Sequence, residues 1–553
     1  MNVRQAAVAG LLVLAAMAPT TRAADVSAEA DTGRAIYLQG VLGSGSPLEG
    51  VREAGVRTTG AAAACVNCHQ RSGLGSEEGR ISIPPITGEY LFHPRAHTGD
   101  DPVLPYVENM HSNRDPYSDA TVARAIRAGL DEAGRPLNYL MPRFAMNDAD
   151  MAALIAYLRK LTVRREAGVT DTVLHFATIF APDADPVKRG AVLNVLQQYV
   201  IEKNRFPLKP SPRMWTSGKT AYSKSMYMAN RRWQLHVWDL TGPASTWQAQ
   251  LDKHLAEEPV FAVLSGLGGS NWAPVQAFCE RSAVPCLFPN VEAPVDSGHD
   301  FYSLYFSRGV LLEAGLIAQE VLEPAGQPAV AEVDQIYRAG DSGESAARAL
   351  DADLQGHGLR VHDHVLVAQG HAQGVAEALR KIAKTLRPDH ALVLWLRPAD
   401  IAALGKPPAG AIRIYMSGLM GGLEDAPLPE AWRAHTRLTY PFDLPDKRGI
   451  RLDYPLGWFS LRHIPVVALQ VQADTWLACS IVGDAINHMA DSVVRPYLIE
   501  KLQNMVEHRL ITGYYPHLTL ATNEHFASRG GYIAHFKDPS GTKLVADGDW
   551  LVP

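Results

Sequence analysis

Short apolar runs alternate with longer amphipathic segments over the C-terminal two thirds of the chain. The runs Thr172–Ile179 and Val260–Leu264 are predicted to be strands, and Asp185–Glu202 places its apolar side chains mostly on one side of a helix. Further predicted strands are Val284–Pro289, Val333–Tyr337, His364–Val367, Ala391–Leu396 and Ile412–Met416. Repeated strand–helix units favour parallel sheets with helices on both faces, and roughly 380 residues suffice for two such lobes.

The N-terminal part, from about residue 31 to about residue 165, has a different pattern, with long loops and a few helical patches. Ser118–Gly129 has helical spacing, and Gly129 suits its C-terminal end. Asn147 can cap the clearest helix, whose apolar residues recur at i, i+3, i+4 and i+7: Met151, Leu154, Ile155 and Leu158. The polar stretch Arg164–Thr170 follows this helix, so we expect one domain over residues 31–165 and another over residues 170–553.

The first 23 residues have the pattern of a secretory signal peptide. Arg4 precedes the apolar stretch Ala6–Ala18, and small residues at Thr21 and Ala23 favour cleavage after Ala23. Neither this stretch nor any later apolar run reaches the roughly 18 residues that a membrane span needs. We therefore expect a protein without a membrane span, outside the cytoplasm, which in a bacterium means the periplasm.

Composition narrows the class of protein only a little. The chain has 553 residues, of which 47% are hydrophobic, as in ordinary globular proteins. The net charge of −6 argues against a nucleic-acid partner, which would favour a basic face. No G-x-S-x-G or H-E-x-x-H motif occurs, so the sequence offers no case for a hydrolase.

The segment Cys65-Val66-Asn67-Cys68-His69 is the most specific chemical signal in the chain. C-x-x-C-H is the attachment signature of c-type haem, in which two thiols bond to the macrocycle and the adjacent imidazole is the proximal iron ligand. A zinc site would need a second Cys/His pair nearby, and a thioredoxin-like pair should follow a strand. Neither context is present, so we predict one covalently bound haem c.

The sixth position of the iron would be filled by Met141, which lies one loop before the terminal helix of this domain. A thioether opposite histidine raises the reduction potential and suits electron transfer. A lone methionine more often fills a core. The other candidates for this position are Met146, Met110, His93 and His111.

Three cysteines remain after the haem motif. Cys279 and Cys286 are seven residues apart, and in an oxidising compartment they are candidates for a disulfide, the alternative being two buried thiols. Cys479 lies in an apolar stretch and is expected to be a buried, inert thiol.

Residues from about Gly33 to Leu161 resemble a mono-haem class I cytochrome c domain. The resemblance rests on the haem motif and on four further segments: Arg71–Gly75, Ile83–Ile86, Met141–Phe144 and the helix that ends at Tyr157-Leu158. It implies an all-α domain in which Cys65 and Cys68 carry the haem, His69 is proximal and Met141 distal. The Tyr37–Cys65 insert and the interval from Cys68 to Met141 are longer than in the family pattern.

The C-terminal region resembles type I periplasmic binding proteins of the branched-chain amino acid type. The resemblance rests on the strand and helix after Thr172, on Leu264–Gly268 before a helix, on Val284–Pro289 and on length. It implies a two-lobed α/β domain that holds a small polar molecule between its lobes. The turn carrying Ser265, Gly266 and Trp272 would border that cleft; alternatively, its glycines only make a tight strand-to-helix turn.

These features favour an electron carrier over a catalyst. The first hypothesis is a periplasmic protein that takes electrons from a dehydrogenase and passes them to an oxidase or another cytochrome, with the second domain sensing a ligand or docking the partner. The alternative is a solute-binding or sensory protein with an accessory haem. A third hypothesis is an enzyme, for example a haem peroxidase, and the single C-x-x-C-H disfavours the di-haem type of peroxidase.

Overall fold

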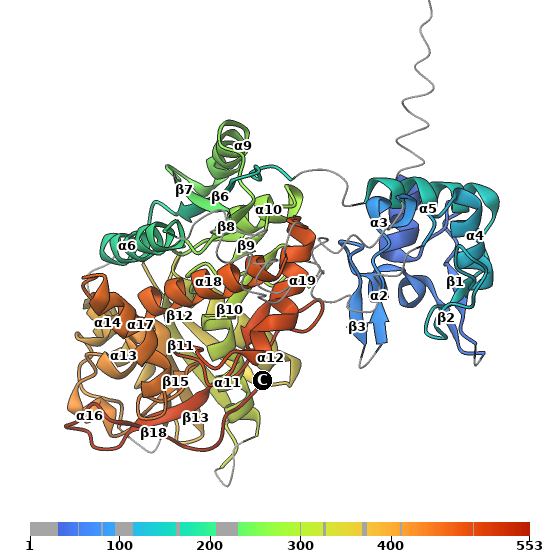
Figure 1. Cartoon of the computed structure of the whole chain (residues 1–553). Helices are drawn as coiled ribbons and strands as arrows, with labels where there is room; N and C mark the ends of the chain where they lie inside the picture. The colour runs from blue at the N-terminus through green and yellow to red at the C-terminus, as the bar shows by residue number, and fades with distance from the viewer. Residues whose placement is uncertain are drawn as a thin grey trace, which may run out of the picture. The chain divides into compact units, whose positions relative to one another are not determined.

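The chain folds into two compact units that divide between residues 164 and 165 (Figure 1). The computed structural model describes residues 31–93, 114–161, 166–205 and 231–553, apart from residues 54, 79–80, 299, 324–327, 368–372, 410–411 and 490–491. The predicted signal peptide, residues 1–23, lies outside the described residues. Within the described ranges, no helix has the length and apolar character that crossing a bilayer requires.

The first unit mixes helices with short strands, which corrects the expectation of an all-α domain. Its helices span residues 31–39, α2 Val66–His69, α3 Gly88–Phe92, α4 Asp119–Ala128 and α5 Asp148–Lys160, with the 3-10 turn η1 at Gly60–Ala63. Strands β1 (Glu49–Val51), β2 (Arg57–Thr59) and β5 (Arg143–Phe144) form one antiparallel sheet, and β3 (Ser76–Glu78) pairs with β4 (Ile81–Ile83). The long insert before the haem motif is what supplies β1 and β2.

In the first unit, the capping residues predicted from the sequence mark the ends of helices α4 and α5. The Asn147 side chain accepts a hydrogen bond from the backbone N–H of Asp150 and begins α5. Gly129 adopts φ +69° after α4, a left-handed conformation that ends a helix at little cost for glycine. The predicted apolar face of α5 is buried: Met151, Leu154, Ile155 and Leu158 join the core of this unit.

The second unit contains two sheets, each the centre of one lobe. The first lobe has six parallel strands in the order β16-β10-β9-β8-β6-β7: β6 Val173–Phe180, β7 Arg232–Asp239, β8 Ala262–Leu264, β9 Cys286–Leu287, β10 Ser303–Ser307 and β16 Phe526–Ser528. Its helices are α6 Pro186–Lys203, α9 Trp247–Glu257, α10 Ala273–Arg281, α18 Leu469–His488 and α19 Arg495–Met505, with the 3-10 turns η2 Ala244–Thr246 and η4 Val506–His508. The lobe is therefore the parallel α/β structure that its alternating pattern predicts.

The second lobe has seven strands in the order β12-β11-β13-β14-β15-β17-β18. Five are parallel: β11 Glu332–Arg338, β12 Arg360–Leu366, β13 His390–Trp395, β14 Arg413–Ser417 and β15 Thr436–Tyr440. The last two, β17 (Tyr532–Phe536) and β18 (Leu544–Ala546), are antiparallel, which the strand–helix pattern did not predict. The remaining helices are α11 Val310–Leu322, α12 Ser342–Gly356, α13 Gln373–Ile382, α14 Pro398–Ile401, α15 Gly418–Gly421, α16 Glu430–Arg433 and α17 Gly449–Leu461, with the 3-10 turn η3 Leu423–Asp425.

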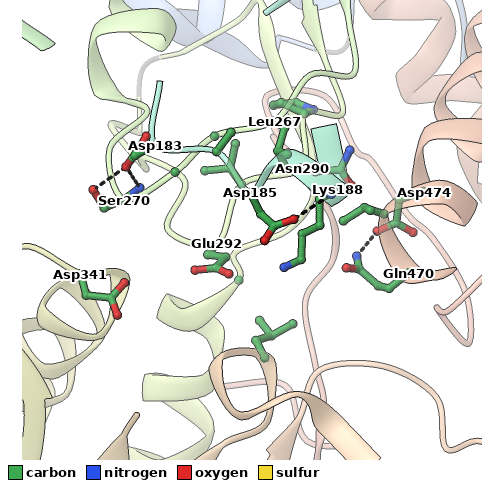
Figure 2. Close-up of a pocket in the computed structure, with 18 of the residues that line it drawn as sticks. Asp183, Asp185, Lys188, Leu267, Ser270, Asn290, Glu292, Asp341, Gln470 and Asp474 are labelled. Carbon is green, nitrogen blue, oxygen red and sulfur yellow. Dashed lines mark hydrogen bonds between the residues drawn. The ribbon is translucent and has the colours of Figure 1, made fainter. Parts of the chain in front are cut away.

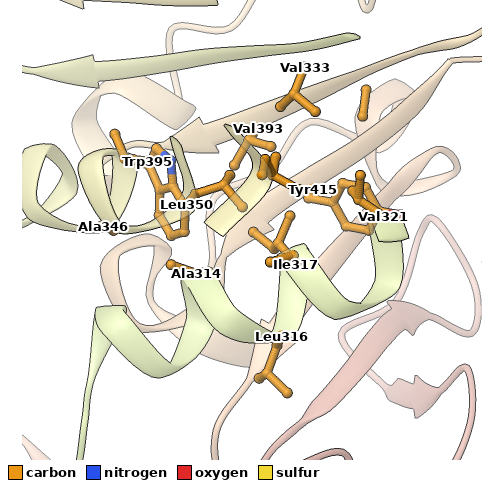
Figure 3. Packing of buried hydrophobic residues seen from close by; sticks show 14 of the residues in the cluster. Ala314, Leu316, Ile317, Val321, Val333, Ala346, Leu350, Val393, Trp395 and Tyr415 are labelled. Atoms are coloured by element: carbon orange, nitrogen blue, oxygen red, sulfur yellow. The ribbon is translucent and has the colours of Figure 1, made fainter. Parts of the chain in front are cut away.

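The core of the second lobe lies between helices α11 and α12 and one face of the sheet. Figure 3 shows Ala314 and Ile317 of α11 facing Val393, Trp395 and Tyr415 of the strands, all of them buried. The indole N–H of Trp395 donates to Gln335 Oε1 at 3.0 Å, so this large aromatic side chain is buried without an unpaired polar atom.

The chain crosses between the two lobes three times. It leaves the first sheet after β10, returns after β15, and crosses again between β16 and β17. Strands that are adjacent in the sequence at the C-terminus therefore belong to different sheets. The two lobes are held together by three connections as well as by their contacts.

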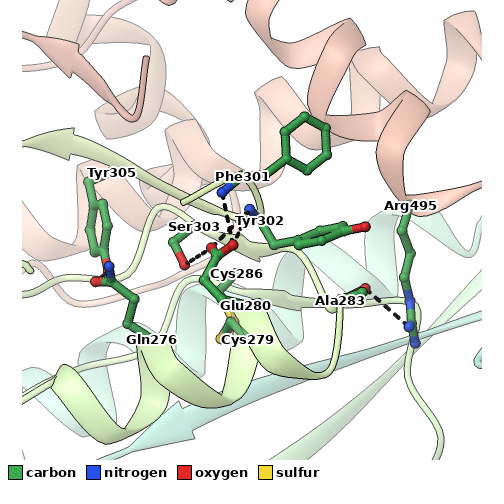
Figure 4. The surroundings of a disulfide bond; sticks show 10 residues. All are labelled: Gln276, Cys279, Glu280, Ala283, Cys286, Phe301, Tyr302, Ser303, Tyr305 and Arg495. Carbon is green, nitrogen blue, oxygen red and sulfur yellow. Dashed lines mark hydrogen bonds between the residues drawn. A yellow bond between two sulfur atoms is a disulfide. The ribbon is translucent and has the colours of Figure 1, made fainter. Parts of the chain in front are cut away.

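A disulfide joins helix α10 to strand β9 in the first lobe (Figure 4). The Cα atoms of Cys279 and Cys286 are 6.1 Å apart, a separation that a disulfide spans readily. Next to it, the Glu280 carboxylate accepts hydrogen bonds from the backbone N–H groups of Phe301 and Tyr302 and from the Ser303 hydroxyl. These contacts tie α10 to the segment that enters β10. Cys479 is a buried, free thiol in α18.

Candidate functional site

The haem-attachment motif forms a single turn of helix at the edge of a cavity. Cys65 precedes α2, and Cys68 and His69 lie within it, so all three face the same region. Burial raises the pKa of the Cys65 thiol to about 12. A redox-active C-x-x-C pair requires a lowered thiol pKa, so this environment is unlike that of a thioredoxin-type pair. Among the described residues, no group of three or more His, Cys, Asp or Glu side chains is arranged to hold a metal ion.

The His69 ring is held in one tautomer by the backbone. Its Nδ1 atom lies 3.0 Å from the Pro84 carbonyl oxygen, and because a carbonyl can only accept, Nδ1 must carry the proton. Nε2 then keeps its lone pair, as a proximal iron ligand requires. Burial, with only 6% of the residue exposed, lowers the pKa of His69 to about 4 and keeps the ring neutral.

Glycine at position 75 allows the loop that carries Pro84 to approach the motif. Gly75 has φ +81°, and a Cβ atom there would lie 2.1 Å from the Ile83 carbonyl oxygen. Its backbone N–H donates to the carbonyl of His69 at 3.2 Å. The β3–β4 hairpin is thus fixed against α2, which places Pro84 next to the imidazole.

The cavity beside this motif has a volume of about 360 Å³ and largely apolar walls. His69 lines it together with apolar residues from four segments, including Ile83, Ile86, Leu91, Val122, Ile126, Leu154 and Leu158. Two thiols, a neutral imidazole and an apolar slot are the donor set and surroundings that a thioether-bound porphyrin needs. The residues present therefore fit a c-type haem.

Two of the candidate distal methionines lie in the wall of this cavity. Met141 and Met146 both line it, and both are partly buried against the core of the first unit. His93 is exposed and is not among the cavity-lining residues. Met110 and His111 lie outside the described residues. The geometry thus leaves Met141 and Met146 as the two described candidates, with Met141 as the prediction.

Charged side chains occupy part of the cavity rim. Arg52, Arg114 and Arg135 line the cavity, as do Asp131 and Glu132. Arg135 pairs with both acids, at 2.8 Å to Asp131 and 3.3 Å to Glu132. The Nε atom of Arg52 is buried and has no hydrogen-bond partner among the described residues. An apolar slot with cations at its rim suits a macrocycle that carries carboxylates.

The second unit has a larger cleft, of about 770 Å³, between its two lobes. Its walls are the loops that follow parallel strands: residues 183–188 after β6, 267–270 after β8, 289–292 after β9, 339–341 after β11, and Arg397 after β13. In α/β domains the carboxyl ends of parallel strands are where ligands bind, because loops from several strands converge there. Figure 2 shows Asp183, Asn290 and Glu292 of the first lobe and Asp341 of the second lobe around this cleft.

An ion-pair cluster bridges the lobes across the cleft. Arg397 of the second lobe donates to Glu292 of the first lobe at 2.6 and 2.8 Å, and to Asp341 of its own lobe at 2.5 and 2.9 Å. The Ser342 hydroxyl also donates to Glu292, at 2.9 Å. The guanidinium of Arg397 lowers the pKa of both carboxyl groups, which are therefore ionised at neutral pH although burial opposes this.

Asp474 of helix α18 is a buried carboxyl group in the cleft wall. Its Oδ2 atom accepts from the Gln470 amide at 2.5 Å and from the Tyr515 hydroxyl at 3.1 Å. Its Oδ1 atom is buried and finds no hydrogen-bond partner in the described part of the chain. Burial raises the pKa of this group to about 7. Phe306 and Phe442, which also line the cleft, pack on the Tyr515 ring at 5.4 and 5.5 Å between centroids.

The structure places the three predicted cleft residues outside the cleft lining. Trp272 is 1% exposed and packs in the core of the first lobe. Ser265 is fully buried, at φ +53°, and its hydroxyl lies 3.2 Å from the Thr475 hydroxyl and accepts from the Asn290 amide at 3.2 Å. Gly266 lies against the backbone of Ile179. The same turn does line the cleft, but with the four residues after Gly266: Leu267, Gly268, Gly269 and Ser270.

Several cleft residues escaped prediction from the sequence. Arg397 directly follows a predicted strand and Asp341 lies four residues after another, so the rule that ligands bind at strand ends would have found them. Asp474 lies within a helix that returns from the other lobe, and no local signal marks it.

A comparison with known protein families identifies a family for most of the first unit. Residues 58–162 match the family model described as Cytochrome c. The sequence therefore contains a cytochrome c domain, which is followed by a two-lobed α/β domain. No curated protein matched the sequence in a search.

The remainder of the chain is similar in structure to solute-binding proteins. A branched-chain amino acid ABC transporter protein from Thermus thermophilus with bound valine has a TM-score of 0.48 and 12% identity, over 70% of this chain and 97% of that one. A solute-binding protein from R. palustris in complex with benzoate has a TM-score of 0.48 and 13% identity, over 69% and 98%. A fatty acid ABC transporter substrate-binding protein from Thermomonospora curvata has a TM-score of 0.47 and 16% identity, over 71% and 95%.

Proposed function

We propose that this protein is an electron carrier of the periplasm, with one haem c covalently bound in the first unit and a ligand-responsive or partner-docking domain in the second. Its partner would be a periplasmic dehydrogenase or another cytochrome. The observation that carries the proposal is that Cys65 and Cys68 lie beside a neutral His69, and that all three residues line one largely apolar cavity.

Each residue of the site has a distinct part in this function. The thiols of Cys65 and Cys68 would hold the group as thioethers, His69 would be its proximal ligand and Met141 its distal ligand. When bound, the haem supplies a one-electron iron couple. The Pro84 carbonyl orients the His69 ring and fixes its tautomer, and the apolar walls exclude water. If His69 and Met141 both bound the iron, no ligand position would remain for a substrate, which would favour electron transfer over catalysis.

The test is a reduced-minus-oxidised spectrum and an intact mass on protein made in a host that matures c-type cytochromes. We expect reversible reduction and a mass increase of one haem. The variant Cys65→Ala/Cys68→Ala should lose the covalent mass increase. Cys479→Ser, which removes a thiol in the other unit, should keep it. A colourless wild-type protein with no added mass would refute the proposal.

A second candidate function is favoured by the cleft. A polar cavity at the strand ends of two lobes, with an unsatisfied buried carboxyl oxygen, is suited to bind a small polar molecule. In that case the chain would be a solute-binding or sensory protein with an accessory haem. Stabilisation of the second unit by an amino acid or an alcohol, measured by calorimetry, would favour this function, because ligands that bind only the folded state raise its stability. Reversible reduction without such stabilisation would favour the carrier.

A further inference from the structure

We propose that the interlobe cleft binds a small organic cation, an amine or alkylammonium with an apolar tail, whose positive end is held by Asp474. This inference rests on the proposal that the cleft binds a small molecule, and it goes beyond that proposal by naming the chemical class.

The first argument is the unpaired oxygen of Asp474. Asp474 is 3% exposed, and burying a carboxylate oxygen without a donor costs free energy. Gln470 and Tyr515 occupy only the other oxygen. Because Asp474 lines the cleft, we infer that a ligand bound there supplies the donor that the buried Oδ1 atom lacks. Figure 2 shows Asp474 and Gln470 side by side at the cleft wall formed by α18.

The second argument is the charge balance of the cleft. Five carboxylates line it, those of Asp183, Asp185, Glu292, Asp341 and Asp474, against three cations, Lys188, Arg338 and Arg397. With Asp474 ionised, the formal excess is two negative charges, and with Asp474 protonated it is one; in both states the excess favours cationic ligands.

The two arginines of the cleft are already engaged by acidic groups. Arg397 is held by Glu292 and Asp341, and Arg338 is paired with Asp400 at 2.6 Å. An anionic ligand would therefore have to compete for both arginines.

The third argument is the apolar surface next to Asp474. Phe306, Phe442 and Tyr515 pack together there, and Leu267, Val291, Leu419 and Val471 also line the cleft. An apolar wall beside a buried anion is complementary to a cationic head with a hydrocarbon tail.

Calorimetric titration of the full-length, haem-loaded protein tests the proposal with two matched sets of probes. The first set is 2-phenylethylammonium, 2-phenylethanol and phenylacetate, and the second is butylammonium, butanol and butyrate. Within a set, the probes share a hydrocarbon part and differ mainly in the polar end. We expect the amine to bind at least about tenfold more tightly than its alcohol and carboxylate counterparts, because only the amine pairs with the buried oxygen.

The variant Asp474→Asn should weaken amine binding at least about tenfold, since the amide cannot supply a negative charge. The control Asp484→Asn removes a carboxylate from the same helix outside the cleft lining, and it should leave the affinity unchanged. A melting curve for each variant shows whether it is folded.

Three outcomes would overturn the inference. If an alcohol or carboxylate binds as tightly as its amine, the cleft binds ligands but the assignment to cations is wrong. If Asp474→Asn is folded and binds the amine as well as the wild type, the role of Asp474 is wrong. If none of the six probes binds, the inference fails. The solute-binding function is decided separately by stabilisation with an amino acid, and the haem spectrum, with the electron-carrier proposal, is unaffected.

Discussion

Arg397 and Glu292 connect the two lobes of the second unit by a two-pronged ion pair, with N–O distances of 2.6 and 2.8 Å. The same guanidinium also holds Asp341, so one cation neutralises two carboxylates that would otherwise repel each other across the cleft. The position of the lobes relative to each other therefore depends on this side chain.

We predict that Arg397→Ala destabilises the second unit by about 3 kcal/mol, because it leaves two largely buried carboxylates without a counter-ion. Chemical denaturation measures this loss. The matched control is Arg338→Ala, which breaks an ion pair with Asp400 within one lobe. Both variants should lose stability, but only Arg397→Ala should increase the radius of gyration in X-ray scattering. An equal increase in both would contradict the bridging role of Arg397.

The distal ligand is tested by two methionine variants. We expect Met141→Ala to lose the far-red band that a methionine–iron bond gives in this family, because the thioether is removed. Met146→Ala, from the same cavity wall, should keep the band. Visible spectroscopy of the oxidised protein distinguishes the two. Loss of the band in Met146→Ala alone would transfer the distal role to Met146.

Gly75→Ala should destabilise the first unit and reduce haem attachment. The left-handed backbone alone costs a non-glycine residue about 1–3 kcal/mol, and the new Cβ would also collide with the Ile83 carbonyl. The yield of covalent haem per polypeptide measures the effect. Gly134→Ala is the control, because Gly134 has a similar φ of +83° but a Cβ added there would have no neighbouring atom within 4 Å. Equal haem yields for the two variants would show that the close contact between Gly75 and the Ile83 carbonyl does not affect haem attachment.

Removal of the disulfide should destabilise the second unit by about 2–3 kcal/mol, the value that loop-closure entropy gives for a short loop. Calorimetry of Cys279→Ala/Cys286→Ala measures the change. A thiol reductant should lower the unfolding temperature of the wild type and leave that of the double variant unchanged. If the reductant affects both alike, it acts elsewhere in the molecule.

Asp474 should make the stability of the second unit depend on pH. Its pKa is about 7 in the folded protein and near 3.8 in the unfolded chain, so the folded state retains the proton more strongly. The resulting stability is present at low pH and is lost as pH rises from about 4 through 7. The side chain in Asp474→Asn cannot ionise. The free energy of unfolding of this variant, relative to that of the wild type, should therefore rise over this pH interval by at most about 4 kcal/mol. Denaturation at pH 5 and pH 8 tests this, and a constant difference would contradict it.

The sequence predicted those parts of the fold that local patterns determine. The run Ala391–Leu396 is β13 displaced by one residue, and Asn147 and Gly129 bound their helices as their side-chain chemistry and φ preference require. Strand β17 was missed because its partner β15 lies more than 90 residues earlier in the sequence, with two lobe crossings between them, and β18 was missed with it because β18 pairs only with β17.

The haem motif and the cleft differ in how much of each could be predicted. The haem motif is contiguous, so five consecutive residues identify it. The cleft, by contrast, is formed by strand ends that are spread over about 300 residues of the sequence. Trp272 shows the limit of such inference: an aromatic residue in a glycine-rich turn fits a binding wall, but whether it points into a cleft or a core depends on helices elsewhere in the chain. In this protein it points into the core.

The placement of the last strands has a consequence for biogenesis. Residues 526–528 are the edge strand β16 of the first sheet, and residues 532–546 supply two strands of the second. Neither lobe can therefore complete its sheet until residues 526–546 have been synthesised. During synthesis, both incomplete lobes would expose unpaired strand edges. A chain that stopped before residue 526 would have two defective lobes instead of one intact lobe and one missing lobe.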